Sequence, residues 1–101
     1  PGEAVAVPAL PRAETASETF ELVATAGAGE VVIYLDRFAT NEPVPDARVV
    51  VETPQGSVEA KGAGDGIYRL AAPWSASPGR YDLIATVTKD SDADVLAFTL
   101  D

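Results

Sequence analysis

Short runs of alternating side chains are the feature that most constrains the fold of this chain. From Glu18 onward, apolar residues recur at every second position, as in Val31, Ile33 and Leu35, and each run ends at Gly, Pro, Asn or Asp. Successive side chains of a β-strand point to opposite faces, so a period of two collects the apolar set on one face. The pattern therefore predicts short amphipathic strands and no amphipathic helix in this part of the chain.

Turn residues divide the chain into these strands. Two prolines and an asparagine at residues 41–46, glycines at residues 62–66 and a longer segment at residues 73–79 break the alternation. The expected strands cover residues 20–25, 30–36, 47–52, 57–61, 67–71, 81–88 and 95–100. About seven short strands at near-regular spacing are typical of a β-sandwich. We therefore predict an all-β, immunoglobulin-like β-sandwich of about seven antiparallel strands over residues 18–101.

Residues 1–17 lack this alternation and are predicted to form a flexible N-terminal tail or linker. Pro1, Pro8 and Pro11 interrupt regular structure, and small or polar residues fill most of the remainder. An alternative is that Ser17 caps a short helix that leads into Phe20. Because the chain does not start with Met, we expect it to be a processed or excised piece of a longer protein.

Strands this short need a second layer, because each must bury its apolar face against another sheet. The predicted core consists of Phe20, Leu22, Val31, Ile33, Leu35, Val49, Val51, Tyr68, Leu70, Tyr81, Leu83, Val87, Leu96 and Phe98. These residues include nearly all the large hydrophobic side chains, so few are left to line a ligand pocket.

The composition excludes several kinds of chemistry, since the chain has no Cys, no Met and no His. It has no thiolate nucleophile, no thioether ligand for copper(I) or silver(I), and no imidazole to act as a base or metal ligand. A serine or threonine nucleophile needs a base, and only carboxylates, Lys61 and Lys89 are present. We therefore predict a non-enzymatic domain with no catalytic, cofactor-binding or metal-binding residues and no cofactor.

The net charge of −9, from seven basic and sixteen acidic residues, limits the partners. Nucleic acids bind mainly through Lys and Arg, and anionic membranes attract basic segments, so neither is expected as a partner. No apolar run approaches the roughly 20 residues of a membrane-spanning helix. Asp36 and Arg37 are expected to pair with Arg48 or Glu52, in exposed ion pairs worth about 0–1 kcal/mol.

Two aromatic residues have both a structural and a functional interpretation. Tyr81 follows the Pro78-Gly79 turn at the start of a strand. This placement favours a tyrosine corner, in which the hydroxyl bonds to nearby backbone, over a ligand contact. Trp74 either caps one end of the sandwich or offers an exposed stacking platform.

Three aspartates, Asp90, Asp92 and Asp94, alternate in the last predicted turn. Carboxylates are ligands for calcium, but Val95 stands where an EF-hand loop requires Gly. A solvated hairpin turn is therefore the preferred interpretation.

Three segments carry a resemblance to a known family: residues 29–47 (GEVVIYLDRFATNEPVPDA), 66–74 (GIYRLAAPW) and 78–87 (PGRYDLIATV). In this order they resemble the amino-terminal immunoglobulin-like domain of periplasmic adaptor subunits, or membrane fusion proteins, of heavy-metal efflux systems of the resistance-nodulation-division (RND) class. The first segment is the most specific, and the resemblance spans most of residues 18–101.

The resemblance implies a periplasmic module within a tripartite efflux pump. Its partners would be the remainder of the adaptor chain, the inner-membrane RND transporter and the outer-membrane channel, and lipoyl, hairpin and barrel domains would lie beyond Asp101. Some relatives bind copper(I) or silver(I) through Met, which this chain lacks, so that function is not carried over. Two alternatives remain open: a carboxylate-based metal-delivery domain that uses Asp90, Asp92 and Asp94, and a carbohydrate-binding or adhesin-type module that uses Trp74 and Tyr68.

Overall fold

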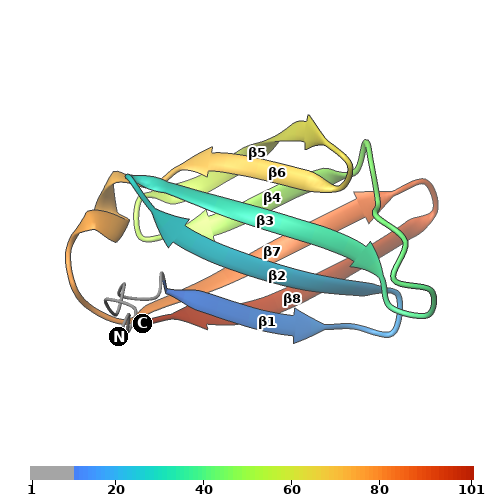
Figure 1. Cartoon of the computed structure of the whole chain (residues 1–101), viewed down its shortest axis with the longest axis horizontal. Helices are drawn as coiled ribbons and strands as arrows, with labels where there is room; N and C mark the ends of the chain where they lie inside the picture. Colours follow the sequence, from blue (N-terminus) through green and yellow to red (C-terminus); the bar gives the residue numbers. More distant parts are fainter. Residues whose placement is uncertain (1–10) are drawn as a thin grey trace, which may run out of the picture.

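The computed structural model describes residues 11–101, and the all-β prediction is confirmed. Eight antiparallel strands and one short 3-10 turn follow each other along the chain (Figure 1). They are β1 (Arg12–Ala16), β2 (Phe20–Gly27), β3 (Glu30–Arg37), β4 (Arg48–Thr53), β5 (Gly56–Gly64), β6 (Ile67–Ala71), η1 (Pro73–Ala76), β7 (Tyr81–Lys89) and β8 (Asp92–Leu100).

The strands form two layers that enclose one core. Their hydrogen-bonded order is β1-β2-β3-β6-β5-β4-β7-β8. One layer contains β1, β2, β3 and β6, the other contains β4, β7 and β8, and β5 contributes to both. The orders β2-β3-β6-β5 and β5-β4-β7-β8 correspond to strands A-B-E-D and C′-C-F-G of an immunoglobulin-like sandwich.

Strand β5 joins the two layers along one edge of the sandwich. Its first half, from Gly56 to Ala60, pairs with β4, whereas its second half, from Lys61 to Gly64, pairs with β6. The register shifts between Gly62 and Gly64, and such an irregularity bends a strand. At the opposite edge β1 and β8 lie close together, but no backbone hydrogen bond joins them within residues 11–101. The sandwich is therefore continuous at β5 and open between β1 and β8.

Strand β1 was not expected, because residues 12–16 were assigned to the flexible tail. The strand pairs with β2 from Arg12↔Thr25 to Ala16↔Glu21, so these residues belong to the domain, and the strand count is eight. Its small and charged residues give no apolar signal, and the pairing depends on backbone hydrogen bonds to β2 instead. The remaining part of the predicted tail, residues 1–10, lies outside the described residues.

Ser17 does not cap a helix. Its hydroxyl oxygen accepts hydrogen bonds from the amides of Phe20 at 3.0 Å and Thr19 at 3.2 Å. Side chains of this kind stabilise tight turns as well as helix starts. Here Ser17 stabilises the turn that connects β1 to β2.

The predicted core is buried with one exception. The confirmed residues are Phe20, Leu22, Val31, Ile33, Leu35, Val49, Val51, Tyr68, Leu70, Leu83, Val87, Leu96 and Phe98. Tyr81 is instead half-buried. The core also contains Leu100 and Val44, which is only 1% exposed although it lies in the β3–β4 loop. Val44 is buried because its amide donates a hydrogen bond to the carbonyl of Leu35 at 2.9 Å, which draws the loop inward.

The sandwich has two distinct ends. The β1–β2, β3–β4, β5–β6 and β7–β8 connections lie at one end, which we call the distal end, on the right of Figure 1. The β2–β3 and β4–β5 turns, η1 and both ends of the described chain lie at the other, which we call the terminal end. These two ends contain the features considered next.

Candidate functional site

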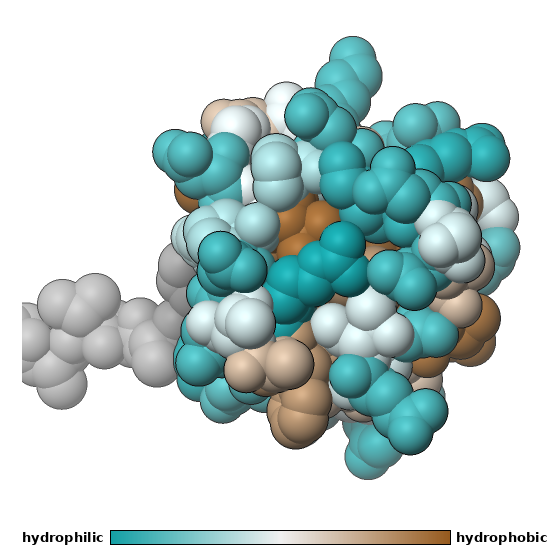
Figure 2. Space-filling view, turned by 90° about the vertical axis from the view of Figure 1, so that its right-hand side faces the viewer, coloured by the Kyte–Doolittle hydropathy of each residue, from teal (hydrophilic) through white to brown (hydrophobic). Residues whose placement is uncertain are grey.

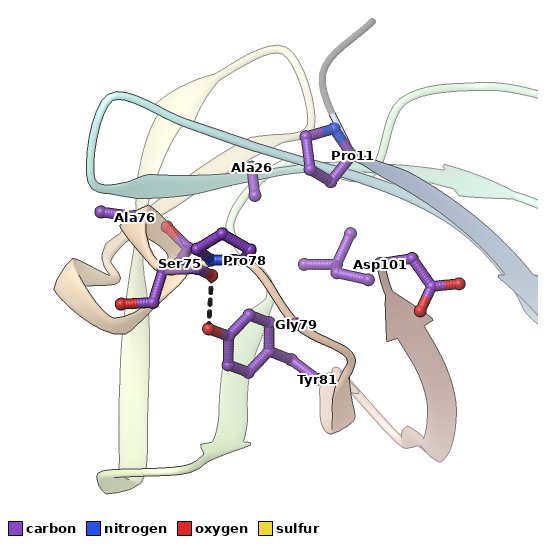
Figure 3. A pocket seen from close by; sticks show the side chains of 10 residues that line it. Pro11, Ala26, Ser75, Ala76, Pro78, Gly79, Tyr81 and Asp101 are labelled. Atoms are coloured by element: carbon purple, nitrogen blue, oxygen red, sulfur yellow. Dashed lines mark hydrogen bonds between the residues drawn. The ribbon is translucent and has the colours of Figure 1, made fainter.

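An apolar pocket lies at the terminal end of the sandwich (Figure 3). Its cavity volume is about 270 Å³. It is lined by Pro11, Ala26, Ser75, Ala76, Ser77, Pro78, Gly79, Tyr81, Leu100 and Asp101. Residues from both ends of the described chain thus meet the β6–β7 loop, and β2 supplies the remaining contact.

Tyr81 forms a tyrosine corner beside this pocket, as the sequence predicted. Its hydroxyl lies 2.6 Å from the carbonyl oxygen of Ser77 and 2.9 Å from that of Trp74. The two carbonyls therefore share one hydroxyl proton, and the loop is tied to the first residue of β7 (Figure 3). The bonds leave the Tyr81 hydroxyl occupied, so its role is structural.

Trp74 caps the same end of the core. It is half-buried and packs against the core cluster, and its ring centroid lies 4.9 Å from that of Tyr81 at an interplanar angle of 57°. Tilted aromatic pairs at this separation are favourable. The cap interpretation of Trp74 therefore agrees with the structure.

The pocket offers shape and apolar surface rather than reactive groups. The Ser75 hydroxyl donates a hydrogen bond to the carbonyl of Ala72 at 2.6 Å, and Asp101 is the one carboxylate in the lining. Among residues 11–101, no hydrogen bond joins a lining serine to a carboxylate that could activate it. Small-molecule sites usually measure about 300–1,000 Å³, so this cavity suits one or two apolar side chains better than a polar substrate.

The distal end is acidic, and it has a hollow of about 320 Å³ with two carboxylates in its lining; the lining residues are Glu18, Thr19, Arg37, Ala39, Thr40 and Glu42. Figure 2 looks at this end and shows hydrophilic residues around a small apolar area. Arg37 covers the core here, with its guanidinium carbon 5.4 Å from the centre of the Phe20 ring and a nitrogen 3.1 Å from a carboxylate oxygen of Asp92. Arg37 thus shields the core from water at the distal end.

The ion pairs expected for β3 and β4 are wrong. Arg37 pairs with Asp92, and Arg48 lies 3.7 Å from Glu59, whereas neither arginine pairs with the partner that we expected. The reason is topological: the β3–β4 loop carries the chain from one layer to the other, so the two strands are not neighbours. Glu52 instead accepts a hydrogen bond from Ser57.

The three aspartates of the last turn do not converge on one point. Asp90 has a left-handed backbone, with φ of 55°, in the hairpin turn, and Asp92 is held by Arg37. In the part of the chain that the structure describes, no group of three carboxylates is close enough to hold a metal ion. No helix among these residues is long and apolar enough to cross a membrane.

Tyr68 cannot be a stacking platform, because its side chain is only 2% exposed. Its hydroxyl donates to the carbonyl of Val44 at 2.6 Å and accepts from the amide of Ala47 at 2.9 Å. Burial raises the pKa of Tyr68, the hydrogen bond from Ala47 lowers it by less, and the nearby charge of Asp46 adds a further small increase. Tyr68 therefore fastens the β3–β4 loop to the core.

One exposed carboxylate near the terminal end also has a shifted pKa. The hydrogen bond that Thr99 donates to Asp82 at 2.7 Å lowers the pKa of this carboxyl, and Arg80 lowers it further. Both partners are on the surface, and the arrangement orders the outer side of β7 and β8 rather than a cleft.

Sequence reasoning missed the terminal pocket. Its lining comes from residues 11, 26, 75–79, 81 and 100–101, which approach each other only after the sheets have paired. The Pro78-Gly79 turn predicts the tyrosine corner at Tyr81, but it gives no indication of the cavity beside it.

No protein-family model, curated protein or solved structure matches this chain.

Proposed function

We propose that this chain is a non-catalytic interaction module: the amino-terminal immunoglobulin-like domain of a periplasmic adaptor subunit in a heavy-metal RND efflux system. The resemblance of residues 29–47, 66–74 and 78–87 to that family is the reason for naming it. The terminal pocket is the structural observation that favours an interaction role, because it is apolar, lacks reactive groups and adjoins both ends of the described chain.

In this proposal the remainder of the adaptor docks at the terminal end. An apolar side chain from the neighbouring domain would enter the pocket between Pro78, Tyr81 and Leu100. The tyrosine corner holds the loop in place before docking, which reduces the entropy lost on binding. The domain would thereby be held at a defined angle within the pump.

The alternatives have no comparable observation in their favour. The carbohydrate-binding interpretation used Tyr68, which is buried, and Trp74, which packs against Tyr81. The metal-delivery interpretation used three aspartates, of which Asp92 is paired with Arg37.

Removal of the domain from the full-length adaptor tests the proposal. The variant without residues 12–101 would be produced in the native host in place of the wild-type adaptor. We expect growth in toxic concentrations of zinc, cobalt, nickel, copper or silver to fall, and less transporter and channel to co-purify with the adaptor. Unchanged growth together with unchanged co-purification would overturn the proposal.

A point variant tests the pocket separately. Ala76 is exposed at the rim, so Ala76→Lys adds a charge to the pocket without filling the core. Ala16→Lys is the matched control, because Ala16 is equally an exposed alanine but lies at the distal end. We expect Ala76→Lys, and not Ala16→Lys, to lower metal resistance and co-purification.

A further inference from the structure

The outer side of β4, β7 and β8 exposes an apolar area. Val95 is 65% exposed and Ile84 is 43% exposed. The register places Val50, Thr86 and Val95 in one row, and Ile84 lies between Glu52 and Ala97 in the next. Side chains of the same parity on paired strands share a face. We call this surface, made of Val50, Ile84, Thr86, Val95 and Ala97, the β7–β8 face.

The charge pattern of this face is unusual for a chain with a net charge of −9. After Asp82, every outward position of the β7–β8 hairpin is uncharged; these positions are Ile84, Thr86, Thr88, Ala93, Val95, Ala97 and Thr99. The charges at the margins already have partners, since Arg48 pairs with Glu59 and Arg80 with Asp82. The outer side of the hairpin is therefore uncharged beyond Asp82, and β4 adds Arg48 and Glu52, which are opposite in sign, at its edge.

The opposite outer surface, on β1, β2, β3 and β6, is different. It also has an exposed aromatic residue, Tyr34, at 43% exposure, but its neighbours Val23 and Ile67 are half-buried. Charged residues lie across it on every strand: Arg12, Glu14, Glu21, Glu30, Asp36 and Arg69. That surface has the mixture of charges expected of one that faces water.

We propose that the β7–β8 face binds the same face of a second copy of this chain, with the two sheets packed against each other. Two molecules of strong negative charge repel each other, and a neutral face lets them approach without placing like charges in contact. A two-fold axis in the plane of the face brings an apolar area onto its own copy.

The ends of the face favour a head-to-tail arrangement. Arg48, opposite Thr88, lies at the distal end of the face, and Asp82, opposite Thr99, lies at the terminal end. A two-fold axis perpendicular to the strands reverses the strand direction of the second copy. Arg48 of one copy then lies at the same end of the interface as Asp82 of the other.

The size of the face predicts a weak dimer. Three strands about 4.8 Å apart and roughly 30 Å long cover roughly 400 Å² on each copy. The sum, roughly 800–900 Å², is less than the about 1,200–2,000 Å² buried in stable interfaces. We expect a dissociation constant on the order of 0.1 mM, which falls as added salt screens the repulsion between the two copies.

Sedimentation equilibrium of the whole 101-residue chain tests this inference. We expect a monomer–dimer equilibrium at protein concentrations up to about 1 mM, and tighter association at about 0.15 M salt than at about 0.01 M. The Val95→Lys variant should dimerise at least tenfold more weakly, while Tyr34→Lys on the opposite surface is the matched control and should dimerise like the wild type. Circular dichroism checks that both variants are folded.

Two further measurements locate the contact. Amide NMR shifts that depend on concentration should include Val50 as well as β7 and β8, whereas shifts confined to β8 would indicate edge pairing and overturn the proposal. An equimolar mixture of Val95→Lys and Val95→Glu should associate more tightly than either variant alone. A strictly monomeric chain at about 1 mM and both salt concentrations, or a dimer that Val95→Lys leaves intact, would also overturn it. None of these results depends on the efflux proposal.

Discussion

The two ends of the sandwich use the same residue type in two different ways. At the distal end Tyr68 is buried, and its hydroxyl both donates to Val44 and accepts from Ala47. At the terminal end Tyr81 is half-buried, and its hydroxyl donates a shared hydrogen bond to the carbonyls of Trp74 and Ser77 in one loop. The first arrangement draws a loop into the core, and the second holds a loop beside the core and leaves a pocket.

The difference arises from what fills the space next to each tyrosine. At the distal end the side chain of Val44 enters the core, and Gly66 allows the loop to approach β3 closely. At the terminal end the residues that follow Trp74 are small or cannot continue a strand, and none of them reaches the core. A loop that contributes a large buried side chain fills the core beneath it, whereas a loop of small residues can leave an apolar site for another molecule.

The largest expected effect is that of Gly66→Ala at the distal end. Gly66 has φ of 77°, and an added Cβ would lie 2.7 Å from the carbonyl oxygen of Leu35, which accepts the hydrogen bond from Val44. The left-handed backbone and the clash together should lower the free energy of unfolding by about 3 kcal/mol or more.

Gly29→Ala is the control for this comparison. Gly29 has nearly the same φ, 74°, but an added Cβ would meet nothing within 4 Å, so only the backbone strain of about 1–2 kcal/mol is expected. Urea denaturation measures both variants. Equal losses of stability would show that the close contact at Gly66 does not hold the distal loop.

Removal of each tyrosine hydroxyl should have unequal effects. Tyr68→Phe leaves the carbonyl of Val44 and the amide of Ala47 without their partner in a buried site, and should lower the free energy of unfolding by about 2 kcal/mol. Tyr81→Phe should lower it by about 1 kcal/mol, because water can replace the hydroxyl in the open pocket. The comparison would fail if Tyr81→Phe proved the more damaging change in urea denaturation.

The smallest expected effect is a dependence of stability on alkaline pH. Burial raises the pKa of Tyr68, so the unfolded chain loses this proton before the folded chain does. The free energy of unfolding should therefore be unaffected by Tyr68 below about pH 10, the usual value for Tyr, and should fall as the pH rises from there toward the raised pKa. Thermal unfolding at several pH values measures the slope. Tyr68→Phe keeps every other titratable group, and a slope unchanged in this variant would contradict the assignment to Tyr68.

The sequence predicted the core better than it predicted the edges. Phe20, Leu83 and Leu96 were assigned correctly because alternation is a local property of a strand and needs no knowledge of its neighbours. Strand β1 was missed because its residues have no apolar period, and its place depends on the unpaired edge of β2. Val44 was missed for a similar reason, since a loop residue becomes buried only when the loop is fastened by Tyr68.

The candidate sites show the same difference between local features, which the sequence predicts, and features that join distant segments. The tyrosine corner at Tyr81 followed from a turn and a strand that are adjacent in sequence. The terminal pocket, the Arg37–Asp92 pair and the neutral β7–β8 face each join segments that are distant in the chain. No local pattern indicates which of these segments will meet.

The order of side chains by itself therefore determined that this protein is all-β, with seven of the eight strands of residues 11–101 and most of its core, because strand faces and turn chemistry are local. Tertiary structure alone decided that β5 serves both layers, that β1 completes one of them, and that the loop at one end buries Val44 while the loop at the other end borders an apolar pocket. The physical reason is that pairing register and loop packing are settled by contacts between residues far apart in the chain, where backbone hydrogen bonds and the volumes of side chains from different strands must agree.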